Sequence, residues 1–312
     1  MDHLNIGIDV SKDHLDVAAN SADMAHFQVA RDHDGLTELI ERLKPLGVER
    51  IAVEATGGFE SVVTAALAAA GLPVVVVNPA QVRAFAKALG KRAKTDPIDA
   101  AVIARFAEAV KPDLRPLADA QTEALADLVA RRRQIIVMIS AETQRLKRAT
   151  GRSERSIKRL LRALQKELSD IDSDIDTSIR DSSVWQQKID LLKSMPGVGD
   201  QIARTLIAEL PELGTLTRRQ VAALVGLAPW TRQSGQWRGK SFIGGGRASV
   251  RTALYMGALT AARHNPTLKT FRDKLVADGK PKQLAAIAVA RKMITMLNAI
   301  IRDNQPWREQ TA

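Results

Sequence analysis

Two carboxylates, Asp96 and Asp99, stand three residues apart in the segment KRAKTDPIDA, beside the cations Lys91, Arg92 and Lys94. Asp is favoured as a helix N-cap and Pro at the first helical position, so Asp96 and the proline after it could begin a helix. Asp99 would then complete a capping box. Alternatively, both carboxylates bind a metal ion next to a polyanion. The segment alone leaves both interpretations open.

Two further carboxylates interrupt apolar segments that have the pattern of strands. Asp9 lies in IGIDVSK, and Glu54 lies in IAVEATG, just before two glycines. A charge inside a sheet is costly unless it is paired or bound to metal, although Asp9 at an exposed strand end would need no such partner. Ligands of open α/β sheets collect beside the carboxyl ends of strands. We therefore predict that Asp9 and Glu54 belong to one site.

Together, the four carboxylates would offer the hard oxygen ligands that Mg²⁺ or Mn²⁺ prefers. Paired ions of this kind can activate an attacking oxygen and stabilise a leaving one in phosphoryl transfer. The neighbouring cations would then hold the substrate phosphates. The predicted metal ligands are Asp9, Glu54, Asp96 and Asp99, and the predicted phosphate contacts are Lys91, Arg92 and Lys94.

The elements that must position these residues alternate between strand and helix patterns over the first 115 or so residues. The predicted order is βββαβαβα followed by a last helix, with apolar strands that become parallel neighbours through helical crossovers. This is an α/β fold. The predicted strands are 4–11, 14–20, 26–30, 50–56 and 72–78, and the predicted helices are 34–47, 58–71, 79–90 and 97–110.

The next segment has long helical patterns with heptad spacing. One apolar seam runs through Ile157, Leu161, Leu164, Leu168, Ile171 and Ile175. Two such helices form either an antiparallel hairpin or a coiled-coil dimerisation arm, and the sequence does not separate these. We predict three domains: the α/β domain 1–117, a helical hairpin or coiled-coil arm 118–190, and a mostly helical, basic domain 191–312.

Composition limits the class of protein. The 312 residues are 45% hydrophobic, enough for roughly two domains with real cores, and there is no Cys to form disulfides or zinc sites. The N-terminus has no signal-peptide pattern, and a cytoplasmic protein without a membrane segment is expected. Residues 1–190 hold 27 Lys and Arg against 28 Asp and Glu, whereas residues 191–312 hold 19 against 7. This C-terminal excess favours a polyanionic partner over a merely cationic surface.

The C-terminal domain contains two possible nucleophiles. Ser234 precedes Gly235 in an irregular, Gly-rich segment near Arg232, Arg238 and Lys240. Judged from the neighbouring residues alone, Ser234 is more simply interpreted as a serine in a turn, because a hydroxyl is a poor nucleophile without a base or a metal. The only tyrosine, Tyr255, lies in the apolar helical pattern VRTALYMGALTAA, where a packed core residue is the simpler interpretation.

Several other segments are candidates for nucleic-acid binding. The segment MPGVGDQIA resembles a helix-hairpin-helix, whose glycine turn lets backbone N–H groups approach phosphates, or is simply a capped turn. The cationic runs are either solvated helix faces or binding surfaces. The candidates in these segments and beside the serine are Gly197, Gly199, Arg131, Arg132, Arg133, Arg155, Lys158, Arg159, Arg232, Arg238, Lys240 and Arg247.

In combination, these segments resemble a known family. GIDVSK, VEATG and KTDPIDA, in the order βββαβαβα, resemble the RNase H-like, RuvC-type nuclease domain with an Asp, Glu, Asp, Asp tetrad. SMPGVGDQIARTLIAEL, LVGLAPW, RQSGQWRGK and RASVRTALYMGAL resemble the second conserved domain of the insertion sequence 110 family of transposases, relatives of the Piv DNA invertases. The resemblance covers essentially the whole chain.

This resemblance implies a DNA recombinase with an unusual mechanism. The tetrad Asp9, Glu54, Asp96 and Asp99 would bind Mg²⁺ or Mn²⁺, and Ser234 would attack DNA to form a covalent phosphoserine link. The family further implies a structured bridge RNA that pairs with donor and target DNA, and a homodimer or homotetramer. The alternatives are a RuvC-like nuclease that uses metal-activated water, and a non-catalytic nucleic-acid-binding module.

Overall fold

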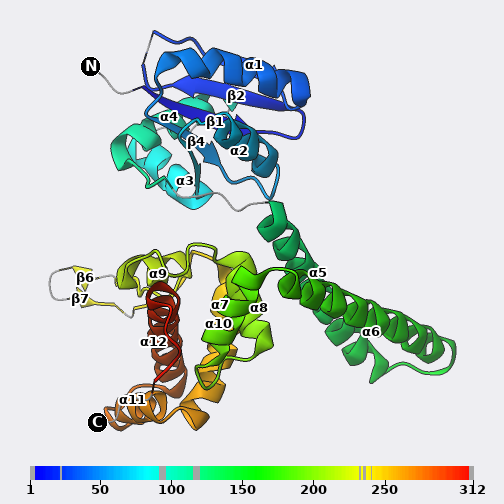
Figure 1. The fold of residues 1–312 in the computed structure, drawn as a ribbon. Helices are drawn as coiled ribbons and strands as arrows, with labels where there is room; N and C mark the ends of the chain where they lie inside the picture. The colour runs from blue at the N-terminus through cyan, green and yellow to red at the C-terminus, as the bar shows by residue number, and fades with distance from the viewer. Residues whose placement is uncertain are drawn as a thin grey trace. The chain divides into compact units, whose positions relative to one another are not determined.

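The computed structural model describes residues 4–21, 23–90, 96–114, 120–231, 233–234, 237–239 and 241–308, with the backbone alone for 96–98 and 237–238 (Figure 1). The chain divides into two compact units, 1–117 and 118–312. We call them the sheet unit and the helical unit. The predicted separation of 118–312 into an arm and a further domain stays a prediction.

The sheet unit is built on five strands in the order β3-β2-β1-β4-β5. β1 pairs antiparallel with β2 and β2 with β3, whereas β1, β4 and β5 are parallel neighbours, as expected for strands joined through helices. The α/β fold class is thus confirmed. The strands are β1 (Asn5–Val10), β2 (His14–Ala19), β3 (Phe27–Ala30), β4 (Arg50–Glu54) and β5 (Val74–Val77).

Helices cover both faces of this sheet (Figure 1). One core joins alternate residues of the strands to α1 (His33–Leu43) and α2 (Glu60–Ala69). A second, smaller core joins the opposite face to α3 (Pro79–Ala88) and α4 (Asp96–Val110). Local signals define the ends of α1: the Asp32 carboxylate accepts the Gly35 N–H at 2.9 Å, and after the short η1 (Lys44–Leu46) Gly47 takes a left-handed φ of 59°.

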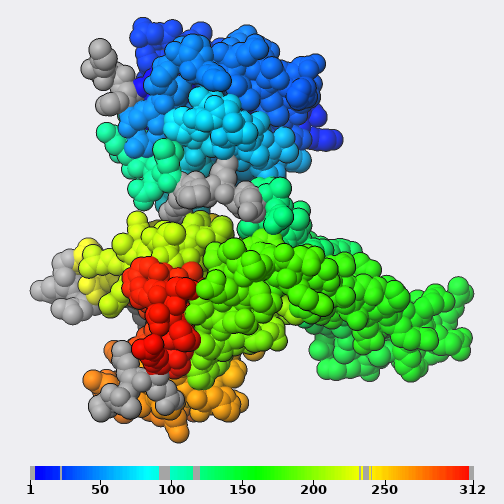
Figure 2. Space-filling model, viewed as in Figure 1, coloured from blue at the N-terminus to red at the C-terminus, as the bar shows by residue number. Residues whose placement is uncertain are grey.

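The helical unit begins with a hairpin of two long helices, which Figure 2 shows standing out as an arm. The heptad seam of α6 is its least exposed stripe, and Ile171 and Ile175 share a core with Leu125 and Ile135 of α5. The elements of this unit are α5 (Ala120–Leu146), α6 (Gly151–Arg180), α7 (Ser183–Lys193), α8 (Asp200–Glu209), α9 (Arg218–Leu224), β6 (Gln233–Ser234), β7 (Trp237–Arg238), α10 (Ala248–His264), α11 (Pro266–Ala277) and α12 (Lys282–Asp303).

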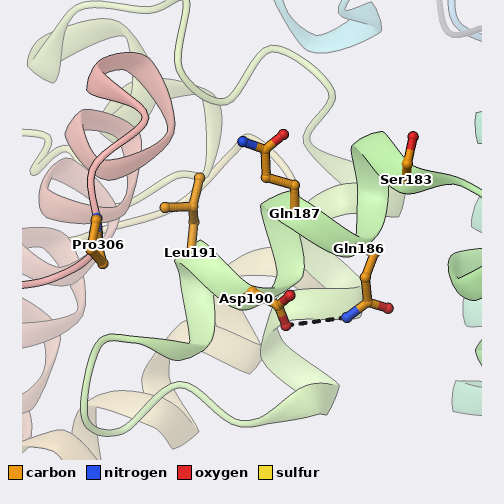
Figure 3. Close-up of a pocket in the computed structure, with 6 residues that line it drawn as sticks. All are labelled: Ser183, Gln186, Gln187, Asp190, Leu191 and Pro306. Carbon is orange, nitrogen blue, oxygen red and sulfur yellow. Dashed lines mark hydrogen bonds between the residues drawn. The ribbon is translucent and has the colours of Figure 1, made fainter.

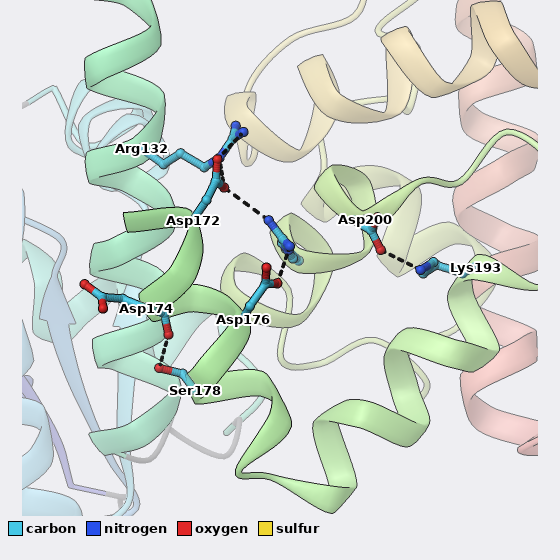
Figure 4. Close-up of polar contacts among 8 residues, drawn as sticks. Arg132, Asp172, Asp174, Asp176, Ser178, Lys193 and Asp200 are labelled. Carbon is cyan, nitrogen blue, oxygen red and sulfur yellow. Dashed lines mark hydrogen bonds and ion pairs between the residues drawn. The ribbon is translucent and has the colours of Figure 1, made fainter. Parts of the chain in front are cut away.

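An ion-pair network fixes the base of the arm to α8 (Figure 4). Arg132 Nε of α5 donates to Asp172 Oδ1 of α6 at 2.7 Å. Arg204 of α8 donates to the same oxygen at 3.2 Å and also pairs with Asp176. The side chains of Arg132 and Arg204 are only 16% and 14% exposed, so both charges need these partners.

Among the described residues, one helix, α12, is long and apolar enough by composition to cross a membrane, which was not expected from the sequence. Half of its apolar window is buried inside the helical unit, and Val289, Met293 and Leu297 are completely buried. This is the pattern of a core helix.

Candidate active site

Asp9 and Glu54 lie on the same face of the sheet. In β1, Ile6, Ile8 and Val10 pack in the core with α1 and α2, so the alternation of side chains turns Gly7 and Asp9 toward α4. In β4, Ile51 and Val53 join the same core, whereas Ala52 packs with residues of α4, which turns Glu54 toward α4 as well. Because Ile8 is in register with Val53, the next residues of these parallel strands, Asp9 and Glu54, are neighbours.

Helix α4 packs directly on this face, backbone against backbone. A Cβ added at Gly7 would lie 2.2 Å from the carbonyl oxygen of Ala100 and 2.3 Å from the amide nitrogen of Ala104, closer than real Cβ atoms come. Only glycine permits this approach. Asp99 immediately precedes Ala100, so the contact at Gly7 brings the first turns of α4 to the strand that carries Asp9.

Asp96 is the first residue of α4 and Asp99 lies in its first turn, in agreement with the interpretation of this segment as a helix start. The side chain of Asp96 lies outside the described residues, as do Lys91, Arg92 and Lys94. The carboxylates of Asp9, Glu54 and Asp99 are half-buried and each takes part in an interaction. Among the described side chains, no group of three or more His, Cys, Asp or Glu could hold a metal ion.

A further buried carboxylate, Asp16, was missed by the sequence analysis. It stands directly opposite Asp9 in the β1–β2 pair, and its side chain is 3% exposed. One oxygen of Asp16 contacts His26 Nε2 at 2.9 Å and the other accepts from Gln28 Nε2 at 3.2 Å, while His14 Nε2 lies 3.6 Å away. The signal was present in HLDVAAN, where one acid again interrupts an apolar strand. No chemistry had been assigned to the histidines, because they lack metal-ligand spacing.

Ser234 belongs to the helical unit and lies in a small β-hairpin, which we call the serine hairpin (residues 230–242). β6 and β7 pair so that Ser234 is opposite Trp237, and an isolated bridge joins Trp230 to Phe242 at the base. The Ser234 side chain is exposed. Of the predicted neighbouring cations, Arg232, Lys240 and the side chain of Arg238 lie outside the described residues.

The glycine turn of MPGVGD connects α7 to α8. Gly197 has a φ of 101°, and an added Cβ would lie 2.4 Å from the Ala261 Cβ, so this glycine is required by packing on α10. Gly199 has open space around it. At the start of α8, Asp200 accepts a hydrogen bond from Lys193 at 2.6 Å, which holds the pKa of this carboxyl below its ordinary value of 3.8.

Several predicted phosphate contacts already have protein partners. Arg132 pairs with Asp172, Arg133 donates to Glu209 at 2.6 Å, and Arg247 donates both guanidinium nitrogens to the buried Glu212 at 2.5 and 2.7 Å. Such pairs fix helices in place. Other predicted phosphate contacts are exposed to solvent. These are Arg131 on α5, and Arg155, Lys158 and Arg159 on α6.

The described part of the helical unit contains several hollows. A groove of about 1140 Å³ between α5, α8 and α10 brings together Arg132, Arg133, Gly197 and Gly199 with mostly apolar neighbours such as Met256. A second, shallower hollow beside α7 contains none of the predicted site residues. Its lining is Ser183, Gln186, Gln187, Asp190, Leu191 and Pro306 (Figure 3).

Comparisons with known proteins add independent information. A transposase family profile of the DEDD type matches residues 6–150, and a second profile, described as transposase of the IS116/IS110/IS902 family, matches residues 189–273. The pilin gene-inverting protein of Moraxella bovis is 28% identical over 330 residues, which cover 97% of each chain. An IS110 protein of Streptomyces coelicolor is 34% identical over 116 residues, covering 36% of this chain and 28% of that protein. An IS116 protein of Streptomyces clavuligerus is 25% identical over 97% of this chain and 96% of its own.

Proposed function

The chain belongs to the IS110 family of transposases, and from that membership we propose that it cuts and rejoins DNA strands through a covalent link between Ser234 and DNA. The family consists of DNA recombinases that act by phosphoryl transfer. The proposal specifies the residues that perform this transfer, the metal ion, the guide RNA and the oligomeric state. It also assigns an RNase H-like, RuvC-type fold to the sheet unit and places the protein's action on DNA in the bacterial cytoplasm.

The observation that best supports the proposal is the placement of acids on one face of the sheet. Asp9 and Glu54 are neighbours on adjacent parallel strands, and Asp99 lies in the first turn of the helix that packs against them. Carboxylates that share one face of a sheet repel each other if they come together without cations to compensate them. A site of this kind is expected at the carboxyl ends of parallel strands.

The chemistry of these donors fits a hard divalent cation. Asp9, Glu54, Asp96 and Asp99 would hold Mg²⁺ or Mn²⁺, which would supply Lewis-acid stabilisation of charge on the phosphate. Asp16 would not be a ligand in this scheme, because both of its oxygens already accept hydrogen bonds or contact a histidine. Its negative charge, directly across from Asp9, adds to the demand for a cation at this position.

Ser234 would be the nucleophile. Its Oγ attacks the phosphorus of a DNA phosphodiester and forms a Ser–O–P bond, while one deoxyribose oxygen leaves and takes a proton. Attack by a hydroxyl of a second strand reverses the step and releases the serine, so the number of phosphodiester bonds is conserved. The exposure of the Ser234 side chain on a projecting hairpin suits attack on a large substrate.

Site-specific inversion is the second candidate reaction, because a pilin gene-inverting protein matches this chain along its whole length. Inversion and transposition use the same strand chemistry and differ in how the DNA sites are arranged. A plasmid with two sites in inverted orientation separates them, since inversion exchanges the flanking sequences without loss of DNA.

We further propose a structured bridge RNA and a homodimer or homotetramer as partners. Exposed cations near the tip of the arm, Arg155, Lys158 and Arg159, support a polyanion contact there. Lys158 also pairs with Glu154 at 2.5 Å, one turn away, but such exposed pairs exchange readily.

The decisive test is a denaturing gel that separates protein-linked DNA from free DNA. Ser234→Ala is expected to abolish the linked species and leave nucleic-acid binding intact. Ser241→Ala is the matched control, because Ser241 is an exposed serine of the same hairpin, and its hydroxyl contacts Thr231. Adduct that persists in Ser234→Ala would contradict the assignment. Nicked DNA without adduct in the wild type would favour a metal-dependent nuclease.

A further inference from the structure

The serine hairpin carries two large aromatic side chains at its base. The backbones of Trp230 and Phe242 exchange both hydrogen bonds, with N–O distances of 2.7 and 3.1 Å. Residues directly opposite each other in an antiparallel pair project their side chains on the same face. Trp230 is 61% exposed and Phe242 is 46% exposed. The hairpin therefore presents an aromatic surface to solvent, which we call the aromatic platform.

The other face of the same ladder is polar. The next residues along the two chain segments are Thr231 and Ser241, whose hydroxyl oxygens lie 3.2 Å apart. A ladder with one aromatic and one hydroxylated face is suited to contact with a partner on the aromatic side. Figure 1 shows β6 and β7 projecting to one side of the helical unit.

The charge of the surrounding sequence indicates which partner this is. Between Glu212 and Asp273 the chain has no carboxylate, but it has ten Lys and Arg, of which Arg247 and Arg272 pair with these two flanking acids. Among these, Arg218 and Arg219 are exposed at the start of α9. The excess of positive charge that remains favours a phosphate backbone over an ordinary protein surface. Aromatic rings within such a stretch stack on nucleobases.

We infer that the aromatic platform stacks an unpaired nucleobase next to the phosphate that Ser234 attacks. The inference rests on the proposed role of Ser234. Ser234 lies four positions after Trp230 in the sequence, so their Cα atoms can be at most about 14 Å apart. The platform therefore holds a base near the attacked phosphate rather than at it. Bases inside a duplex have their faces covered, so the ligand is a single-stranded segment of DNA or RNA.

The test measures binding of the full-length protein to a labelled single-stranded oligodeoxynucleotide by fluorescence anisotropy. Removal of one side chain that stacks on a base weakens binding about tenfold, and we expect this loss of affinity for Trp230→Ala. Trp230→Phe keeps an aromatic ring and is expected to stay within about twofold of the wild type. Val184→Ala, at another exposed apolar position in the helical unit, is the matched control and is expected to bind normally.

A second oligodeoxynucleotide with abasic positions identifies what the ring contacts. The wild type is expected to bind it more weakly than the base-bearing strand, and Trp230→Ala is expected to bind both strands equally. Unchanged affinity of Trp230→Ala overturns the inference, as does an equal loss on both strands. A lower molar mass of Trp230→Ala in sedimentation would also overturn it, because the platform would then join two copies of the chain.

This outcome is separate from that of the proposed function. Ser234→Ala keeps the aromatic platform and is expected to bind the single strand normally. If protein-linked DNA persists in Ser234→Ala while Trp230→Ala loses base-dependent binding, the serine assignment fails and a stacking site remains. If Ser234→Ala loses the link and Trp230→Ala binds normally, the stacking site fails alone.

Discussion

The close contact between β1 and α4 makes Gly7→Ala a sharp test of the proposed site. The new Cβ would lie 2.2 Å from Ala100 O and 2.3 Å from Ala104 N, whereas ordinary contacts begin at 3.4 Å. The obstructing atoms belong to the helix backbone, so no side-chain rotation relieves the overlap. Helix α4 must retreat by about 1 Å, and overpacking of this kind costs about 3 kcal/mol.

Hydrogen exchange of the full chain measures this cost locally, without assuming that both units unfold together. A loss of about 3 kcal/mol corresponds to a roughly 150-fold fall in the protection of the most stable β1 and α4 amides. Gly244→Ala is the matched control, because Gly244 has no neighbour within 4 Å of an added Cβ and lies outside the sheet unit. It is expected to leave β1 and α4 unchanged.

The same retreat would move Asp99 relative to Asp9 and Glu54. A misplacement of about 1 Å can reduce a catalysed rate by about 100-fold. Gly7→Ala should therefore cut DNA about 100-fold more slowly at a temperature where it remains folded. Normal protection of α4 would refute the packing argument. Lost protection with a normal cleavage rate would show that Asp99 is not part of the catalytic site.

Three further perturbations have expected outcomes. Chelation of divalent cations should stop strand cleavage, and added Mg²⁺ should restore it; cleavage that persists in excess chelator would remove the metal from the mechanism. Arg132→Ala removes two hydrogen bonds to Asp172 and should cost about 2 kcal/mol, seen as faster exchange at the base of the arm; unchanged exchange would show that Arg204 alone is a sufficient partner for Asp172. Asp200→Asn should destabilise by less than about 1 kcal/mol at pH 7, because the pair with Lys193 is largely exposed. Since the pKa of Asp200 is lowered by folding, its contribution is complete above the ordinary value of 3.8 and disappears as the pH falls through the lowered value; a difference between urea midpoints that persists at lower pH would contradict this.

The arrangement of the sheet unit could be predicted from its sequence because its signals are local. Each strand is a short apolar run, each helix has its own spacing, and glycines such as Gly47 end helices where φ must be positive. The acids at positions 9 and 54 were found for the same reason. Asp16 has the same local pattern, but its meaning depends on the β1–β2 register and on His26, ten residues away, which no local pattern reveals.

The helical unit illustrates the opposite limit. Cations in Arg-rich runs look alike in sequence, yet Arg133 pairs with Glu209, 76 residues away, and Arg247 pairs with Glu212. Only the tertiary packing of helices decides which cations are used internally and which face solvent. Gly197 was likewise predicted to contact nucleic acid, but its close packing against Ala261 of α10 is sufficient to explain why a glycine occupies this position.

The arm also has a consequence for how the chain folds. Only residues 147–150 separate α5 from α6, so the contacts beside this turn join residues that are close along the chain. Contacts nearer the base, such as Arg132 with Asp172, 40 residues away, can then form one after another from the turn. Contacts of this kind form quickly, whereas the pairing of β1 with β4 must first close a loop of about 40 residues. During synthesis, the arm can therefore form as soon as α6 has left the ribosome, before α8, α10 and α12 exist. The arm would then serve as the surface on which the rest of the helical unit assembles.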